Sequence, residues 1–240
     1  MKVMISSDGP HAHYHIRMGW GRVFDAMGYE AILWDVHAIN AFDAFDEFEP
    51  DIFCGQTYNL NHSLYKCIKE RPHLKVMMKG SDWGDMQNEI DPDKYGVLFA
   101  NDEEKNLVEK LKEETGKPDF LHIYYHDNWV GKTHNGWEEI GCRTASIMNG
   151  SDIFMYTRGV FQPEYECDVS FVGGYWPYKA QNMDRYLMPL AHPVGKYNVK
   201  FFGNQGWPGA HYMGWISDEQ VKHLLCSSKI CPNISEPHAT

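Results

Sequence analysis

The chain has 240 residues, enough for one large domain or two small ones, and its 43% hydrophobic and 23% charged residues are typical of a globular protein. Its formal net charge of -11 argues against nucleic-acid binding, because an acidic surface repels a phosphate backbone. The sequence contains no run of 18 apolar residues, and its N-terminus turns polar too early for a secretory signal. We therefore expect no membrane span and a cytoplasmic protein.

The first two thirds of the chain alternate short apolar runs with amphipathic stretches. In chain order they predict strand Lys2–Ile5, helix Arg17–Met27, strands Ala31–Val36 and Asp51–Cys54, helix Leu60–Glu70, strands Leu74–Met78 and Val97–Ala100, a helix capped by Asn101 and closed by Gly116, and strands Leu121–Tyr125 and Ile153–Tyr156. Strands separated by helices of this length indicate βαβ units and a mostly parallel sheet.

The alternation of apolar runs and amphipathic stretches ends near residue 158, where a segment containing Pro163 is typical of a linker. Beyond it the pattern predicts strand Asp168–Val172, helix Gln181–Leu190, strand Val199–Phe202, a helix from Ser217 to about Cys226 and strand Lys229–Ile234. We expect two Rossmann-type domains, 1–157 and 168–240. The second is short, and we expect it to be incomplete, with an apolar surface that a partner chain or a second copy covers.

The six cysteines form no C-x-x-C pair, and most lie in apolar runs. This usage predicts buried free thiols in a reducing compartment and no structural zinc. One segment invites a metal nonetheless, because His11, His13 and His15 alternate and would share a face if the segment were extended. A role as a base or hydrogen-bond donor near a substrate, and a purely structural role, are the alternatives for these histidines.

Ligands of open α/β sheets bind beyond the carboxyl ends of the strands, so the residues that follow each strand are candidates for a site. They are mostly polar and aromatic, and in the first domain they include Asp8, Gln56, Tyr58, Asp82, Trp83, His126 and Asp127. In the second domain, Gly173 and Gly174 follow a strand and could let a phosphate approach backbone N–H groups. Lys179 could neutralise a diphosphate there or be a solvated surface lysine.

Five segments, taken in order, resemble the CgeB-type (spore maturation protein-like) family of GT-B glycosyltransferases. They are MKVMISSDGPHAHYHIRMGW, FEPDIFCGQTYNLN, KGSDWGD, DVSFVGGYWPYK and GWISDEQVKHLLCSSKICPNIS. The resemblance implies two Rossmann-like domains facing across a cleft, the first binding an acceptor and the second a nucleotide-sugar donor. It also implies a reaction that needs no metal or other cofactor.

The resemblance assigns roles to particular residues. It places Asp8 to His13 at the floor of the cleft and Ser81 to Trp83 near the donor sugar, and we expect catalytic residues among Asp8, His11, His13 and Asp82. From their positions after strands of the first domain, we expect acceptor-side contacts from Gln56, Tyr58, Trp83, His126 and Asp127. Contacts to the donor would come from Gly173, Gly174, Tyr175, Lys179, Gly214, Trp215, Ile216 and Glu236. The expected activity is transfer of a sugar from a nucleotide-diphosphate sugar to an acceptor hydroxyl. The resemblance favours retention, and the alternative is inversion with Asp8, His11 or His13 as the base. A catalytically inactive glycan- or nucleotide-binding module and a nucleotide-sugar epimerase are the alternatives.

Overall fold

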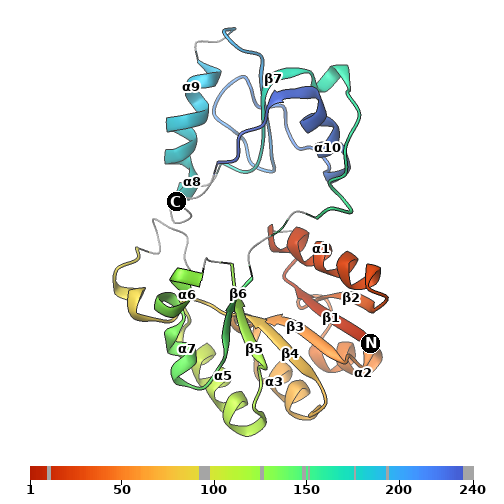
Figure 1. The fold of residues 1–240 in the computed structure, drawn as a ribbon, viewed down its shortest axis with the longest axis vertical. Helices are drawn as coiled ribbons and strands as arrows, with labels where there is room; N and C mark the ends of the chain where they lie inside the picture. The colour runs from red at the N-terminus through yellow and green to blue at the C-terminus, as the bar shows by residue number, and fades with distance from the viewer. Residues whose placement is uncertain are drawn as a thin grey trace. The chain divides into compact units, whose positions relative to one another are not determined.

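The computed structural model describes residues 1–9, 12–91, 98–124, 127–147, 150, 152–175, 177–192 and 195–234, without the side chains of residues 12, 13, 127–129 and 178. The chain divides into two compact units, which are drawn in Figure 1. Unit 1 consists of Met1–Pro92 and Val97–Ser151, and unit 2 of Asp93–Gly96 and Asp152–Thr240.

Unit 1 is built on a six-stranded parallel sheet in the order β2-β1-β3-β4-β5-β6. Its strands are β1 (Lys2–Ser7), β2 (Glu30–Asp35), β3 (Ile52–Gln56), β4 (Lys75–Lys79), β5 (Phe120–Ile123) and β6 (Thr144–Ser146). The described helices are α1 (Ala12–Ala26), α2 (Ala41–Phe48), α3 (His62–Lys69), α5 (Asp102–Thr115), α6 (Asp127–Thr133) and α7 (Asn135–Glu139), with short 3-10 turns η1 (Thr57–Asn59) and η2 (Asp85–Asn88).

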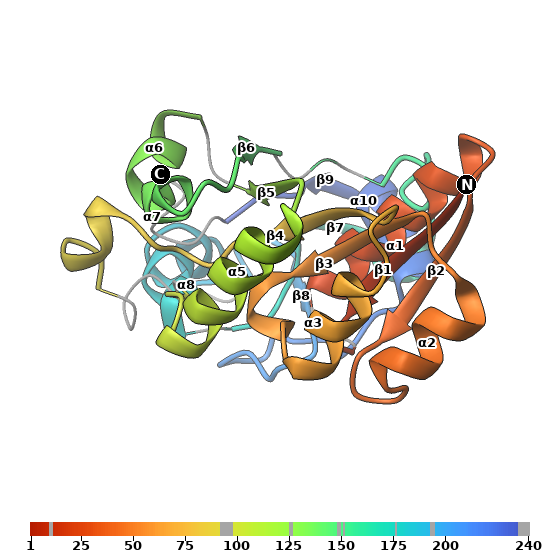
Figure 2. The same cartoon turned by 90° about the horizontal axis from the view of Figure 1, so that it is seen from below.

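The two faces of this sheet are covered by different helices. On one face α1 packs Trp20 and Phe24 against Val3, Ile5 and Cys54. On the other face α2, α3 and α5 bury their apolar stripes in the main core, and in Figure 2 the helices α3 and α5 lie in front of the strands. Side chains alternate between the faces along each strand, so the apolar residues on both faces explain why the strands read as continuous apolar runs.

The strand order gives this sheet one switch point. The chain leaves β1 toward β2 on one side and returns to β3 on the other, so the two connections diverge between β1 and β3. In open parallel sheets the crevice beyond the carboxyl ends of the strands at such a point is where ligands bind. Asp8 follows β1, and Thr57 to Asn59 follow β3, at this place.

Unit 2 has a three-stranded parallel sheet in the order β8-β7-β9. Its elements are η3 (Pro163–Tyr165), β7 (Cys167–Val172), α8 (Pro177–Asn182), a π-helical turn η4 (Met183–Leu187), α9 (Met188–Ala191), β8 (Val199–Phe202), α10 (Asp218–Ser227) and β9 (Ser228–Ile230). The predicted α/β class with parallel sheets is therefore confirmed. Large exposed apolar side chains include Ile153, Val160, Phe161 and Ile230; a partner that covers them stays a prediction.

Two predicted strands are wrong. Residues 98–100 form only a backbone bridge with Asp82, not a strand of the sheet. Residues 153–156 form a turn, because the carboxylate of Asp152 accepts hydrogen bonds from the N–H groups of Phe154 and Met155 and Ile153 stays exposed. The strand after α7 is instead β6, whose side chains are only partly buried and gave little apolar signal.

Candidate functional site

Asp8 is held at the switch point by two side-chain amides. Gln56 Nε2 donates to Asp8 Oδ2 at 2.6 Å, and Asn59 Nδ2 donates to Asp8 Oδ1. The carboxylate is half-buried and is followed by Gly9, whose φ of +92° turns the chain toward α1. Each carboxylate oxygen has a second lone pair, so Asp8 is oriented and can still accept a hydrogen bond from a ligand.

A pocket of about 330 Å³ lies beside this network, at the carboxyl edge of the sheet in unit 1. It is lined by Val36, His37, Tyr58, Asn59, Leu60, Asn61, Asn101, Glu103 and Glu104. The oxygens of Asn61 and Asn101 cap α3 and α5. The lining combines amides, carboxylates, an imidazole and a phenol, which suits a ligand with many hydroxyl groups better than an apolar one.

Lys79 is the last residue of β4, and its ammonium group contacts aromatic rings. Its Nζ lies 5.3 Å from the ring centroid of Tyr58 and 5.6 Å from that of Tyr124. Burial, reinforced by the positive charge of Arg17, lowers the pKa of Lys79 to about 8. Burial and the charge of Asp8 raise the pKa of Tyr58, which stays a neutral phenol.

A second group of buried polar residues includes Glu104, which lines the pocket, and Asp82 and His134. Glu104 is bonded by the hydroxyl of Thr57, and burial raises the pKa of this carboxyl. His134 Nδ1 lies 3.8 Å from Asp82 Oδ1, and burial lowers the pKa of His134 to about 4. Asp82 is itself only 6% exposed. These side chains therefore stabilise the carboxyl edge of the sheet. Asp82 is less accessible to a ligand than Asp8.

Trp83 is partly buried, and its ring contacts other side chains of unit 1. Its ring meets Trp137 edge-on at 4.9 Å, and Lys105 lies over it at 5.2 Å from the centroid. Its backbone N–H donates to Thr133 at 2.8 Å. An acceptor-side role for Trp83 stays a prediction.

Two of the three alternating histidines, His13 and His15, lie on a helix and not on the extended segment that the metal hypothesis required. Residues 12–26 are helical, so His13 and His15 are separated by about 200° around the helix axis. His11 and the side chain of His13 lie outside the described residues. Among the residues that are described, no group of three or more His, Cys, Asp or Glu side chains is arranged to hold a metal ion.

In unit 2, the glycine pair follows β7 as expected, but one of its amides is already used. The N–H of Gly173 donates to Phe202 at 2.8 Å, and its carbonyl accepts from Trp207 Nε1 at 3.0 Å. Gly174 is buried, and Lys179 is half-buried on α8. Of the two amides, that of Gly174 is the one on which a phosphate contact can be proposed.

The other donor-side candidates differ widely in accessibility. Tyr175 donates to Asp184 at 3.0 Å and packs on Trp207 at 5.3 Å, and burial raises its pKa. Trp215 is 70% exposed next to Gly214, whose φ is +97°, whereas Ile216 is 6% exposed in a small core with Leu224. Trp215 is thus the residue of this stretch with a ring face open to a planar ligand. Glu236 lies outside the described residues.

The structure brings together three of the predicted residues, Asp8, Gln56 and Tyr58. It gives Asn59, which also follows the third predicted strand, a contact with Asp8, and it adds Arg17, Lys79 and Tyr124, which sequence reasoning missed. Lys79 could have been found in the same way as the predicted set, since it ends a strand. His126 lies outside the described residues, and Asp127 is described only by its backbone, which begins α6.

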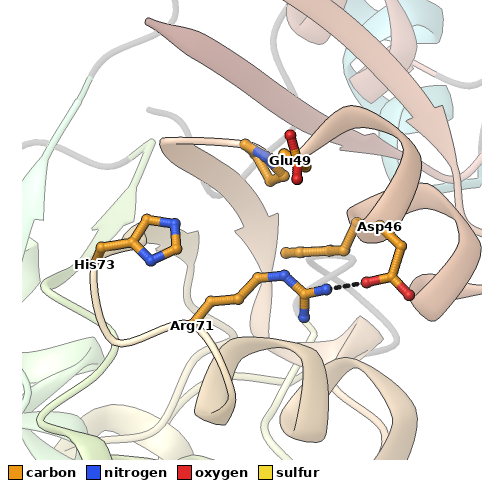
Figure 3. A pocket seen from close by; sticks show the side chains of 6 residues that line it. Asp46, Glu49, Arg71 and His73 are labelled. Carbon is orange, nitrogen blue, oxygen red and sulfur yellow. Dashed lines mark hydrogen bonds and ion pairs between the residues drawn. The ribbon is translucent and has the colours of Figure 1, made fainter.

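A larger pocket of about 530 Å³ lies at the amino edge of the same sheet, before β3 and β4 (Figure 3). Arg71 pairs there with Asp46 and also donates to the carbonyl of Cys67 at 2.9 Å. Glu49 and His73 complete its polar lining. Its cation is already neutralised, and amino edges of parallel sheets rarely bind ligands, so we regard the smaller pocket as the functional candidate.

None of the known family profiles matches the chain, and no curated protein matches it. Solved structures that align with it include MurG from Acinetobacter baumannii (TM-score 0.38, 8% identity, 90% of this chain and 66% of that one) and CalG4, the calicheamicin glycosyltransferase (0.39, 9%, 96% and 74%). An NAD-dependent formate dehydrogenase from Staphylococcus aureus also aligns (0.25, 14%, 92% and 62%). All three TM-scores are below 0.5, so the parallel-sheet topology described above, and not these alignments, defines the fold. Among the described helices, none is long and apolar enough to cross a lipid bilayer.

Proposed function

We propose that the protein transfers a sugar from a nucleotide-diphosphate sugar to an acceptor hydroxyl, with unit 1 binding the acceptor and unit 2 the donor. One observation carries the proposal: Asp8, fixed by Gln56 and Asn59 at the switch point, stands beside a pocket lined by amides and other polar groups. Such an edge recognises hydroxyl-rich ligands. The resemblance of five sequence segments to CgeB-type glycosyltransferases supports the same assignment.

In this proposal Asp8 accepts a hydrogen bond from the acceptor hydroxyl and orients its oxygen. The bond between the anomeric carbon and the diphosphate oxygen breaks as the acceptor oxygen bonds to that carbon. With retention, the departing diphosphate takes the hydroxyl proton, so the charge on the leaving group must be stabilised. Lys179 and the amide of Gly174 are the proposed contacts to that diphosphate, and Trp215 the proposed contact to the nucleobase.

The test begins with the melting temperature of the full chain in the presence of UDP, GDP, ADP, CMP or dTDP. We expect one nucleotide to raise the melting temperature, and the corresponding nucleotide-sugar to be consumed, with release of the nucleoside diphosphate. The anomeric configuration of the product, read by proton NMR, tests retention. If no nucleotide changes the melting temperature and no donor is consumed, the proposal is wrong.

A binding module without turnover is the second candidate, and the bond from Gly173 N–H to Phe202 favours it, because this amide is not open to a diphosphate. It predicts that a nucleotide or glycan binds while a labelled donor stays intact. An epimerase would instead release an altered free sugar or altered nucleotide-sugar without any acceptor.

A further inference from the structure

Arg17 is a buried cation for which the described part of the chain offers no counterion. The residue is 0% exposed, and the one hydrogen bond that it makes among the described residues is long, from Nη2 to the carbonyl of Gly55 at 3.4 Å. Nε and Nη1 have no hydrogen-bond partner among the described residues, and no carboxylate there lies within ion-pair distance. A buried guanidinium with open donors is costly, so it calls for a specific explanation.

The neighbours of Arg17 form one row across the sheet. Gln56, Lys79 and His122 are register partners on β3, β4 and β5. Ser7 belongs to the same row, because it follows Ile5 by two residues as Gln56 follows Cys54, and Ile5 pairs with Cys54. Side chains two apart share a face, so this row lies on the face that α1 covers with Arg17 and Trp20.

Several polar atoms of this row are as open as the guanidinium. The hydroxyl of Ser7 and Oε1 of Gln56 are buried without a hydrogen-bond partner among the described residues. Lys79 Nζ lies over the rings of Tyr58 and Tyr124, and no hydrogen bond or ion pair of Lys79 Nζ is found among the described residues. Aromatic rings also flank Arg17, whose Cζ lies 4.8 Å from the Trp20 ring centroid, and Trp20 in turn packs on His122 at 5.0 Å.

Asp8, Asp82 and Glu104 lie near enough to act on the charge of Lys79, but each has a closer partner. Both oxygens of Asp8 accept amide donors, and Glu104 is bonded by Thr57. Asp82 is turned toward His134. Arg17 and Lys79 therefore place two cations in one cluster that no described carboxylate pairs with directly. Asp8, Tyr58 and Lys79 are only half-buried, so the cluster lies just beneath the surface at the switch point.

We propose that the cluster formed by Ser7, Arg17 and Lys79 binds an oxyanion group, a phosphate or a carboxylate, carried by the ligand of unit 1. The open N–H groups of Arg17 and the hydroxyl of Ser7 donate to its oxygens, and Lys79 supplies the second charge. The sugar or other body of the ligand then lies toward Asp8 and the amide-lined pocket. As a statement about an acceptor this rests on the proposed function, whereas the anion site itself does not.

The test compares three sugars by calorimetric titration into the full chain without any nucleotide: glucose, glucose 6-phosphate and glucuronate. We expect at least one charged sugar to bind about tenfold or more tightly than glucose, as one charge-assisted contact provides. Preference for glucose 6-phosphate identifies the oxyanion as phosphate, and preference for glucuronate identifies it as carboxylate. Equal binding of all three sugars, or no binding of any, overturns the proposal.

Variants test whether the tighter binding of a charged sugar depends on the proposed cluster. Arg17→Met and Lys79→Met should each remove the advantage of the charged sugar, whereas Lys75→Met, at the exposed amino end of the same strand, should keep it. Lys79 is half-buried and lies on another element, so its variant tests the site independently of Arg17→Met. An advantage that survives in Lys79→Met, or that falls equally in Lys75→Met, contradicts the site. Nucleotides are absent throughout, so failure of the donor assignment leaves this result unaffected.

Discussion

The two edges of the sheet in unit 1 differ in whether their buried charged groups have partners. At the amino edge, two largely buried cations are paired: Lys117 Nζ lies 3.0 Å from both oxygens of Asp119, and Arg71 pairs with Asp46. At the carboxyl edge, Arg17 and Ser7 are buried with open hydrogen-bond capacity. Polar groups placed for stability are satisfied within the fold, whereas groups kept for a ligand are left incomplete without it.

The largest effect expected from this contrast concerns Asp8. Asp8→Asn should lower transfer activity by about 100-fold or more. The NH₂ group of the new asparagine would face the NH₂ group of Gln56 or Asn59, so one hydrogen bond is lost, and the ligand hydroxyl loses its charged acceptor. Asp35→Asn, which changes an exposed aspartate at the end of the neighbouring strand β2, is the matched control. Initial rates of nucleoside diphosphate release measure both. Equal losses in the two variants would remove Asp8 from the site.

The second effect is a pH dependence of stability from His134. Its folded pKa of about 4 lies below the value of 6.5 for an unperturbed histidine, so folding disfavours the protonated form. The free energy of unfolding is therefore highest above pH 6.5, where His134 is neutral in both the folded and the unfolded state. It falls by about 3 kcal/mol as the pH drops toward 4, because the unfolded state takes up the proton first. Denaturant midpoints of the wild type and His134→Gln between pH 7 and 4 check this, since the variant should lose part of the slope. Identical slopes would contradict it.

At the amino edge, breaking a pair should be destabilising. Lys117 is 8% exposed, and Asp119 also accepts the N–H of Val76 at 2.7 Å, which holds this carboxylate in place. Lys117→Met should lower the free energy of unfolding by about 1–3 kcal/mol, less than for a fully buried pair because Asp119 is partly exposed. Urea denaturation measures the change, and an increase in stability would break the proposed contrast between the edges.

The smallest effect concerns Glu49, which lines the amino-edge pocket. It ends α2 with φ at +50°, a left-handed conformation that glycine adopts without steric cost. Glu49→Gly should raise the free energy of unfolding by about 0.5–1 kcal/mol and leave ligand binding and activity unchanged. A loss of activity with intact folding would show that this pocket has a functional role after all.

The sequence predicted the parallel α/β class and part of the site for one physical reason. Apolar runs bounded by polar turns locate the carboxyl ends of strands, and Asp8, Gln56 and Tyr58 were found there. Arg17 was missed because the sequence shows a charged residue at the start of a predicted helix, whereas the helix begins at Ala12 and carries Arg17 over the sheet. Burial of a charge depends on tertiary packing, which has no local signature.

The failed predictions have the same origin. The apolar run at residues 153–156 looks like a strand, but Asp152 bonds its backbone in a turn and Ile153 remains exposed. Alternation of the histidines indicated a shared face only under an extended conformation, and the segment is helical from residue 12. The Asp152 carboxylate decided the first conformation and the helix α1 the second, so in neither case did the pattern of the short segment alone decide it.

The claim that the carboxyl edge is kept incomplete for a ligand is tested most directly by urea denaturation of the wild type and Arg17→Met, each with and without inorganic phosphate. Without phosphate the variant should be more stable than the wild type by about 1–2 kcal/mol, because it no longer buries unsatisfied donors. Phosphate at ten times its Kd should stabilise the wild type by about 1.4 kcal/mol more than the variant, in which only the general salting effect of phosphate remains. A variant that is less stable than the wild type and gains equally from phosphate would contradict the account.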